Sequence, residues 1–188
     1  MFKRKIQNSE YGFTIMEVLA VIFIISVALV GSIGVVLQNV RLQERSKNSL
    51  IALGLAQEGM ELTKNKRDNN FLQGRFWYEG FLDNSACVNC MASTSFVIHL
   101  DNSGSSSTIE IDNTVSQLQD ARFYLDSDGF YTHVNTSTST NFFRLIKADY
   151  FITASSTIVS STVDVVVGWL ERGRMHDYEL ITVLYDWY

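Results

Sequence analysis

The clearest pattern along the chain is a run of twenty uncharged residues, 18–37, in which Val, Ile and Leu predominate. A helix needs about this many apolar residues to cross the hydrocarbon core of a bilayer. Positive side chains lie on both sides of the run, at residues 3–5 before it and at Arg41, Arg45 and Lys47 after it. The run therefore predicts one membrane-spanning helix, while the positive-inside rule gives nearly a draw on its orientation.

A second helical pattern follows this run directly. Residues 38–48 are polar. After them side chains recur at steps of three and four, namely Leu50, Leu53, Ala56, Gln57 and Met60, and beside them Ile51, Leu55 and Leu62. Such an amphipathic stripe usually packs onto the protein's own domain rather than binding a cofactor. The basic residues and Asn pair at 64–70 are typical of a helix end. We expect one helix from about Phe13 to Lys66, about 80 Å long, with a membrane half at 13–37 and an amphipathic half at 38–68.

The rest of the chain, residues 69–188, contains short segments rich in β-branched and aromatic residues between polar loops. Asp126-Ser127-Asp128-Gly129 is typical of a turn between two such segments, and 171–177 is the expected loop of a final hairpin. A helix followed by consecutive antiparallel strands is an α+β layout, with the sheet packed on the amphipathic half of the helix. The expected strands are 96–100, 108–111, 122–125, 130–133, 142–147, 150–153, 163–170 and 178–187.

Alternation within the final hairpin predicts which side chains share a face, because successive residues of a strand point to opposite sides. On the first strand, one face is expected to carry Val163, Val165, Val167 and Trp169. On the returning strand, a second apolar face is expected from Ile181, Val183, Tyr185 and Trp187.

Length and charge limit the classes of function. A chain of 188 residues with a net charge of −5 allows one compact domain beside a membrane anchor. No stripe of basic residues interleaved with aromatics follows the first helix, which argues against nucleic acid as the main partner. The chain contains no proline, so its turns must rely on Gly, Asn, Asp and Ser, and Gly31 and Gly34 are the candidate soft points of the first helix.

Cys87 and Cys90 form the one redox-like motif, a CxxC pair. In a reducing compartment such a pair indicates thiol exchange or half of a zinc site. A zinc site needs four ligands, and the three histidines, His99, His133 and His176, show no ligand spacing. If the domain lies outside the cytoplasmic membrane, a local disulfide between Cys87 and Cys90 is favoured.

The segment at Asp126 and Asp128 is similar to the opening of a calcium loop. The sequence continues as Phe130-Tyr131-Thr132-His133 and does not complete the ligand pattern of that loop. A tight turn closed by Asx hydrogen bonds is the favoured interpretation, and Asp126 and Asp128 remain weak metal candidates.

Catalytic motifs are missing from the sequence. It has no phosphate-binding glycine loop, no nucleophile elbow and no pair of histidines at helical spacing. We therefore expect no enzyme activity and no cofactor.

The N-terminal segment combines four features: a basic start, a Gly12-Phe13 junction, a single carboxylate at Glu17, and the apolar run. A secretory signal has its cleavage site after the apolar core, whereas the small residue here precedes it. The combination resembles the N-terminus of type IV prepilins and type II secretion pseudopilins. The likeness is close over about the first quarter of the chain. It is looser in the second half, where the turn at 128–133 and the final hairpin resemble minor pilins and small pseudopilins.

This resemblance implies roles for three residues. Residues 1–12 would be a leader, a membrane peptidase would cut between Gly12 and Phe13, and the new amino group of Phe13 would be N-methylated. Glu17 matches the carboxylate of these families, which in a filament would meet the amino group of a neighbour's Phe13 and so offset the cost of burying a charge. The alternative is that Glu17 lies in the headgroup layer of an ordinary signal anchor.

The resemblance also implies a function and a location. The chain would be a minor pilin or pseudopilin, a single-pass protein of the cytoplasmic membrane with a cytoplasmic N-terminus and a periplasmic or extracellular head at 69–188. Its partners would be a leader peptidase that also methylates, other pilin subunits and the inner-membrane assembly machinery. The filament would serve assembly, secretion, adhesion or DNA uptake. A major pilin remains possible, and so does a non-polymerising membrane-anchored adhesin or sensor with an uncut N-terminus.

Overall fold

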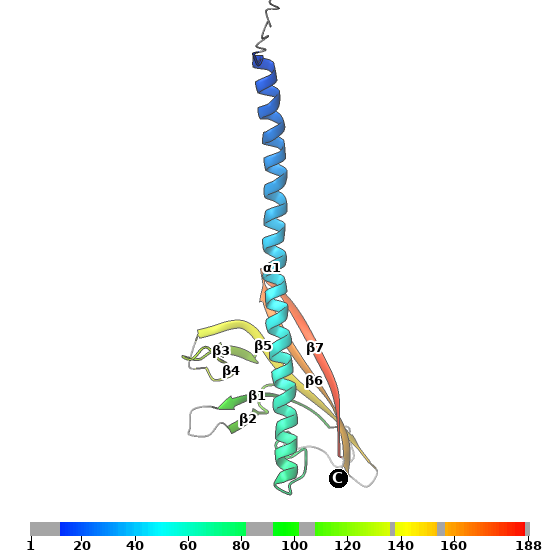
Figure 1. The fold of residues 1–188 in the computed structure, drawn as a ribbon. Coiled ribbons are helices and arrows are strands. Elements are labelled where there is room, and N and C mark those ends of the chain that lie inside the picture. The colour runs from blue at the N-terminus through cyan, green and yellow to red at the C-terminus, as the bar shows by residue number, and fades with distance from the viewer. Residues whose placement is uncertain (1–11, 82–91, 102–107, 136–137, 154–156, 187–188) are drawn as a thin grey trace, which may run out of the picture. The chain divides into compact units, whose positions relative to one another are not determined.

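The computed structural model describes residues 12–81, 92–101, 108–135, 138–153 and 157–186 (Figure 1). These residues form one long helix followed by seven strands, which confirms the expected α+β class. The chain divides into two compact units, residues 1–44 and 45–188. The elements are α1 (Ile15–Leu72), β1 (Ala92–Asp101), β2 (Thr108–Asp112), β3 (Arg122–Leu125), β4 (Tyr131–Thr132), β5 (Thr138–Ile152), β6 (Ile158–Glu171) and β7 (Arg174–Tyr185).

The first unit contains the apolar part of α1. Every residue from 12 to 44 is exposed. Among the described residues, α1 is the one helix long and apolar enough to cross a membrane, and none of its apolar window is buried. At this coarse level the expected membrane-spanning helix agrees with the structure.

In the second unit, the C-terminal part of α1 packs against the sheet through small side chains. Ala52 and Ala56 are fully buried, and Gly59 is buried between them and Thr63. The expected stripe is partly correct. Ala56 and Met60 are buried, as are Leu55 and Leu62 beside them, whereas Leu50 is 65% exposed and Gln57 is exposed. The small residues allow the helix backbone to approach the sheet closely, so they decide which face is buried.

The helix ends at Leu72 rather than at Lys66, and the Asn pair does not terminate it. The Asn70 side chain is buried and donates to the carbonyl oxygens of Trp77 and Glu79, at 3.1 and 2.8 Å. After Leu72 the chain reverses at Gly74, whose φ of 68° lies in the left-handed region that suits glycine after a helix. Asn70 thus fastens the following loop to the last turn of the helix.

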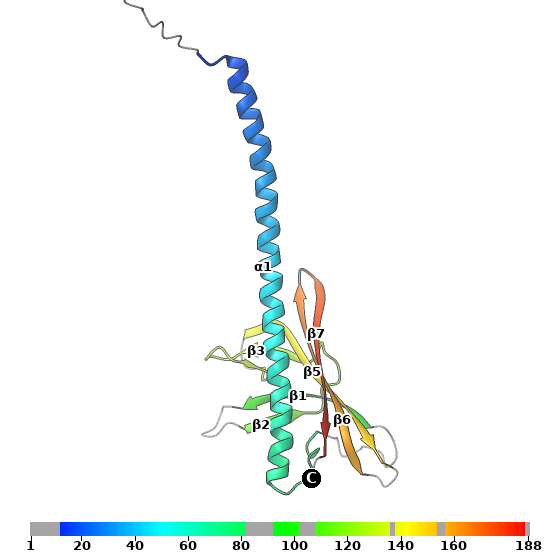
Figure 2. The same ribbon diagram turned by 45° about the vertical axis from the view of Figure 1, so that its right-hand side comes forward.

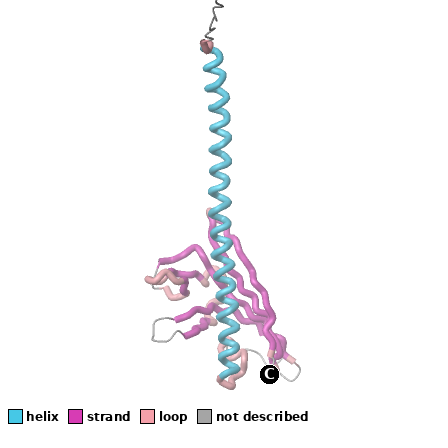
Figure 3. The backbone as a smooth tube through the Cα atoms, viewed as in Figure 1, coloured by secondary structure: helices cyan, strands magenta, loops and turns pink. Residues whose placement is uncertain are grey.

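The strands form one antiparallel sheet built around β5, which is the longest strand at 15 residues (Figures 2 and 3). One edge of β5 pairs with β3 near its start and with β1 near its end, and the other edge pairs with β6. β2 and β4 extend the sheet beyond β1 and β3, and β7 pairs with β6. The helix-facing side chains of β1, β5 and β6 complete the core: Phe96, Ile98, Ile146, Val163, Val165 and Val167.

Two strands expected separately, 142–147 and 150–153, are parts of β5. The polar residues that suggested a break, Lys147 and Asp149, occupy exposed positions of a continuous strand, whereas Ala148 and Tyr150 between them are buried. Lys147 lies opposite Asp164 of β6. Lys147 and Asp149 are polar because they lie on the exposed face of the strand, and not because the strand is interrupted there.

The final hairpin is tighter than expected. β6 and β7 are joined by Arg172 and Gly173, which both have positive φ, 51° and 77°, as a two-residue type I′ turn requires. The expected loop at 171–177 is therefore wrong, and most of it belongs to β7. Two-residue turns of this type match the right-handed twist of the paired strands, so pairing continues up to Glu171 and Arg174.

The two predicted apolar faces of this hairpin differ in burial. Val163, Val165, Val167 and Trp169 share one face, as expected, and all four are buried. Ile181, Val183 and Tyr185 share a face of β7, but it is the exposed one, and Trp187 lies outside the described residues. The alternate positions, including Tyr178, Leu180 and Leu184, pack against the core instead.

Candidate functional site

The N-terminal end of α1 is organised by Thr14. The backbone N–H groups of Glu17 and Val18 donate to the Thr14 carbonyl oxygen, at 3.1 and 3.2 Å. The Glu17 N–H also lies 3.3 Å from the Thr14 hydroxyl oxygen, which is the arrangement of an N-cap. Gly12 and Phe13 lie just before the cap, outside the helix, and both are exposed. The peptide bond between Gly12 and Phe13 is therefore accessible at the edge of the helix.

Glu17 lies in the first turn of α1 and is the only charged residue between Gly12 and Arg41. A carboxylate in the first turn interacts favourably with the helix dipole. That gain is well below the roughly 2.5 kcal/mol or more that a charge costs inside a bilayer. Glu17 therefore needs either water, the headgroup layer, or a cationic partner from outside its own helix.

The apolar part of α1 has no protein covering within the structure. Phe23 is 69% exposed and Val30 is 73% exposed, although both are large and apolar. The two hydroxyl side chains of the run, Ser26 and Ser32, donate to the carbonyl oxygens of Ile22 and Ala28, at 2.7 and 2.8 Å. Since these hydroxyls are satisfied within the helix, the whole segment suits an environment without water.

In the second unit, Arg144 of β5 ties α1 to the sheet. Its guanidinium is completely buried and donates to the Leu55 carbonyl oxygen of α1, at 2.9 Å, and to the Ile98 carbonyl oxygen of β1. The Glu58 carboxylate lies 3.5 Å away and supplies a partly exposed counter-charge. Burial lowers the pKa of Arg144, and the Glu58 carboxylate opposes that shift.

Aromatic rings complete the surroundings of Arg144. The guanidinium carbon lies 4.7 Å above the ring centre of Phe123, and the His133 ring stacks against Phe123 with ring centres 4.3 Å apart. Burial, and then the positive charge of Arg144, lower the pKa of His133 from 6.5 to about 3. His133 is thus neutral at neutral pH, and a second positive charge is kept away from Arg144.

Asp126 closes its own turn through hydrogen bonds to its carboxylate. Its carboxylate oxygen accepts hydrogen bonds from the backbone N–H groups of Asp128, at 2.9 Å, and Phe130, at 2.8 Å. Gly129 closes the turn with a φ of 85°. Within the described ranges, no group of three or more His, Cys, Asp or Glu side chains is placed to hold a metal ion. The Asx turn expected from the sequence is confirmed.

Cys87 and Cys90 lie outside the described residues, so the disulfide remains a prediction. His99 and His133 have ring centres 6.1 Å apart, whereas His176 stacks on Trp169 with ring centres 5.5 Å apart. The histidines that seemed scattered in the sequence therefore include one close pair, which belongs to the surroundings of Arg144.

The chain matches no protein-family model, no curated protein and no solved structure. Support for a function therefore comes from the residues and their geometry.

The sequence reasoning missed Arg144. Its signal was present, because Arg144 is a single charged residue between Phe142-Phe143 and Leu145-Ile146 in an otherwise apolar strand segment. A charge at the centre of such a segment is either exposed on one face or buried with partners. Arg144 lies two residues after Phe142 and therefore on the same face of the strand, so the apolar Phe142 would have favoured a buried position for Arg144.

Proposed function

We propose that the chain is a pilin-like subunit of the minor pilin or pseudopilin kind. A leader of residues 1–12 is removed between Gly12 and Phe13, and the amino group of Phe13 is methylated. The subunit is held in the cytoplasmic membrane by residues 13–37, with its N-terminus in the cytoplasm, and is then extracted into a helical filament.

One observation carries this proposal: the exposed apolar segment of α1, residues 15–37, has a single carboxylate, Glu17, and it lies in the first turn. In the bilayer, lipid covers the apolar side chains. In a filament, copies of the same helix cover one another, and the Glu17 carboxylate meets the Phe13 amino group of a neighbour. This ion pair offsets the cost of burying each charge and sets the axial register of the subunits.

The small residues of the helix support close packing between copies. A Cβ atom at Gly31 or Gly34 would meet nothing within 4 Å, so both positions are open on the surface of α1. Small residues let helix backbones approach each other where no hydrophobic driving force separates helix contact from lipid contact. Packing and the Glu17 ion pair then act together.

The head contributes a mechanical connection in this proposal. Arg144 joins the carbonyl oxygens of Leu55 and Ile98, so the part of α1 from Leu55 onward is fixed to the sheet. Within the second unit, this end of the helix and the sheet are therefore held together by buried hydrogen bonds. The partners are a leader peptidase that also methylates, other filament subunits and the inner-membrane assembly machinery.

The test is to replace Glu17 by Ala and measure the amount of the chain in filaments sheared from the host cells. We expect Glu17→Ala to be processed and inserted normally but to be lost from filaments. Glu44→Ala, which removes a carboxylate from the polar part of the same helix, is the control and should assemble normally. Normal assembly of Glu17→Ala would contradict the pairing role of Glu17. Absence of the wild-type chain from filaments would contradict the proposal and favour a membrane-anchored adhesin or sensor that does not polymerise.

A further inference from the structure

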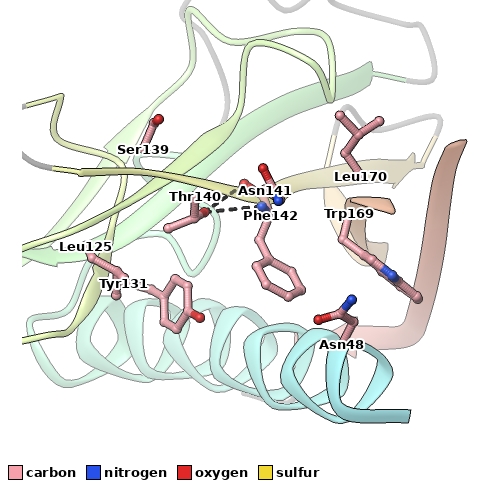
Figure 4. Close-up of a pocket in the computed structure, with 9 residues that line it drawn as sticks. All are labelled: Asn48, Leu125, Tyr131, Ser139, Thr140, Asn141, Phe142, Trp169 and Leu170. Atoms are coloured by element: carbon pink, nitrogen blue, oxygen red, sulfur yellow. Dashed lines mark hydrogen bonds between the residues drawn. The ribbon is translucent and has the colours of Figure 1, made fainter. Parts of the chain in front are cut away.

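The second unit has a pocket of about 230 Å³ between α1 and the sheet. Figure 4 shows four side chains directed toward the hollow: Asn48 from α1, Tyr131 from β4, Phe142 from β5 and Trp169 from β6. Ser139, Asn141 and Leu170 border the pocket, but their side chains point away from it. Alternation along β5 explains the difference, because Asn141 and Phe142 face opposite sides of the strand.

Three aromatic rings contribute to the apolar part of the pocket's lining, beside polar residues of α1 and β5. Phe142 and Trp169 lie directly opposite each other on β5 and β6. The Tyr131 ring meets Phe142 edge to face, with ring centres 6.0 Å apart. His176 stacks on Trp169, and the Trp169 indole N–H lies 3.5 Å from the Glu171 carboxylate, so two contacts hold the indole in place.

Two polar groups also face the hollow. Within the described part of the chain, the Asn48 amide and the Tyr131 hydroxyl make no hydrogen bond. Thr140, by contrast, is already engaged, since its hydroxyl donates to the Phe123 carbonyl oxygen at 2.8 Å. Asn48 offers both donors and an acceptor, and Tyr131 offers one of each. The pocket therefore presents unused hydrogen-bonding capacity beside its aromatic rings.

These features restrict the chemistry of a guest. No lining residue is charged, so a charged guest would lose its hydration without gaining a counter-charge. A purely apolar guest, such as a Leu side chain, would leave the Asn48 amide and the Tyr131 hydroxyl buried without partners. The remaining class is a neutral molecule with an apolar face for the rings and hydroxyl groups for Asn48 and Tyr131.

We propose that this pocket binds one neutral sugar ring of a glycan. A pyranose ring has a face of C–H groups that packs against aromatic rings, and hydroxyl groups at its edge that both donate and accept hydrogen bonds. The volume is below the roughly 300–1,000 Å³ of pockets that enclose a drug-sized ligand, which suits a single ring. A sugar can occupy the pocket whether or not the chain polymerises.

Saturation-transfer NMR tests the proposal with the full chain in a detergent that has no sugar headgroup. The probes are the methyl glycosides of glucose, galactose, mannose and N-acetylglucosamine, each titrated to about 50 mM because a single ring is expected to bind with a millimolar dissociation constant. We expect saturable transfer from the protein to the ring C–H protons of at least one of them. Glucuronic acid, which is charged, should give no saturable transfer.

Matched variants test whether the glycoside binds in this pocket. Tyr131→Phe removes one hydroxyl, and Asn48→Ala removes one amide; each should weaken binding about three- to tenfold, the equivalent of one hydrogen bond. Asn141→Ala removes an amide that points away from the hollow, and it should leave binding unchanged. Thermal melting of each variant shows that it is folded.

Three results would overturn the proposal: no saturable transfer from any neutral glycoside, equal binding by all variants, or equal loss in Asn141→Ala. If no glycoside binds but Tyr131→Phe lowers the yield of filaments, the pocket receives a side chain of a neighbouring subunit and not a sugar.

Discussion

Gly59 of α1 and Arg144 of β5 approach each other so closely that a Cβ atom on Gly59 would lie 2.9 Å from Arg144 Cδ. The same Cβ atom would lie 3.2 Å from Val165 Cγ1. The Arg144 side chain cannot easily move, because its guanidinium is hydrogen-bonded to α1 and β1. Glycine at this position therefore allows the helix to pack over the buried arginine.

Replacing Gly59 by Ala should lower the free energy of unfolding of the head by about 1–3 kcal/mol, the usual cost of overpacking. Gly54→Ala is the matched control on the same helix, because a Cβ atom there meets nothing within 4 Å. Helix propensity should make Gly54→Ala more stable by up to about 1 kcal/mol. Urea unfolding followed by circular dichroism measures both, and equal effects of the two changes would contradict the tight contact at Gly59.

Replacing Arg144 by Met should destabilise the head by about 2–5 kcal/mol, because the carbonyl oxygens of Leu55 and Ile98 each lose a buried charged donor. Glu58→Gln should cost less than about 1 kcal/mol, since the Glu58 side chain is 41% exposed and its pair with Arg144 is weakened by water. Urea midpoints compare the two variants. Wild-type stability of Arg144→Met would show that the guanidinium does not fasten α1 to the sheet.

His133 should make the head less stable in acid. Its pKa is about 3 in the folded state and 6.5 as the ordinary value, so between these pH values the unfolded chain binds more protons. Stability from this residue is complete above pH 6.5 and falls by at most about 1.4 kcal/mol per pH unit as the pH drops toward 3. The groups that act on it are Arg144, His99 and Asp112.

The variant His133→Phe isolates this contribution, because Phe keeps the stacking on Phe123 and cannot be protonated. The difference in unfolding free energy between wild type and His133→Phe should move in favour of the variant as the pH falls from 7 to 4. A difference that stays constant over this interval would mean that His133 titrates normally in the folded head.

Asp164 should show the opposite pH dependence. Burial, and next the neighbouring Glu179 carboxyl group, raise the pKa of Asp164 from 3.8 to about 6. The folded head therefore binds more protons than the unfolded chain in this window, and stability falls as the pH rises through it. Asp164→Asn should raise the urea midpoint at pH 8 and change it much less at pH 4. The same midpoint change at both pH values would be inconsistent with a raised pKa.

The periodicity of apolar residues predicted the helix and the strands well wherever only one face of the element is buried. The helix, the strands of the final hairpin and the inward face at Val163, Val165 and Val167 follow from local patterns. The same alternation predicts that Ile181 and Val183 share a face, which they do, but it cannot tell which of two faces meets the core, and this face is exposed. The end of the helix was missed since the Asn70 amide bonds to a loop seven to nine residues away.

The candidate sites also divide into those that a local sequence motif predicts and those that depend on tertiary packing. The Gly12-Phe13 junction and Glu17 are contiguous in sequence, so a local motif could point to them. Arg144 depends on carbonyl oxygens 89 and 46 residues away, and the pocket brings together residues of α1, β4, β5 and β6. Such arrangements depend on tertiary packing and can be found only in the folded chain.

The central claim, processing between Gly12 and Phe13, is tested most directly by intact-mass measurement and N-terminal sequencing of the protein isolated from its host. The account predicts a mature chain that begins with N-methylated Phe13 and lacks residues 1–12. A chain that still begins with Met1 would contradict it.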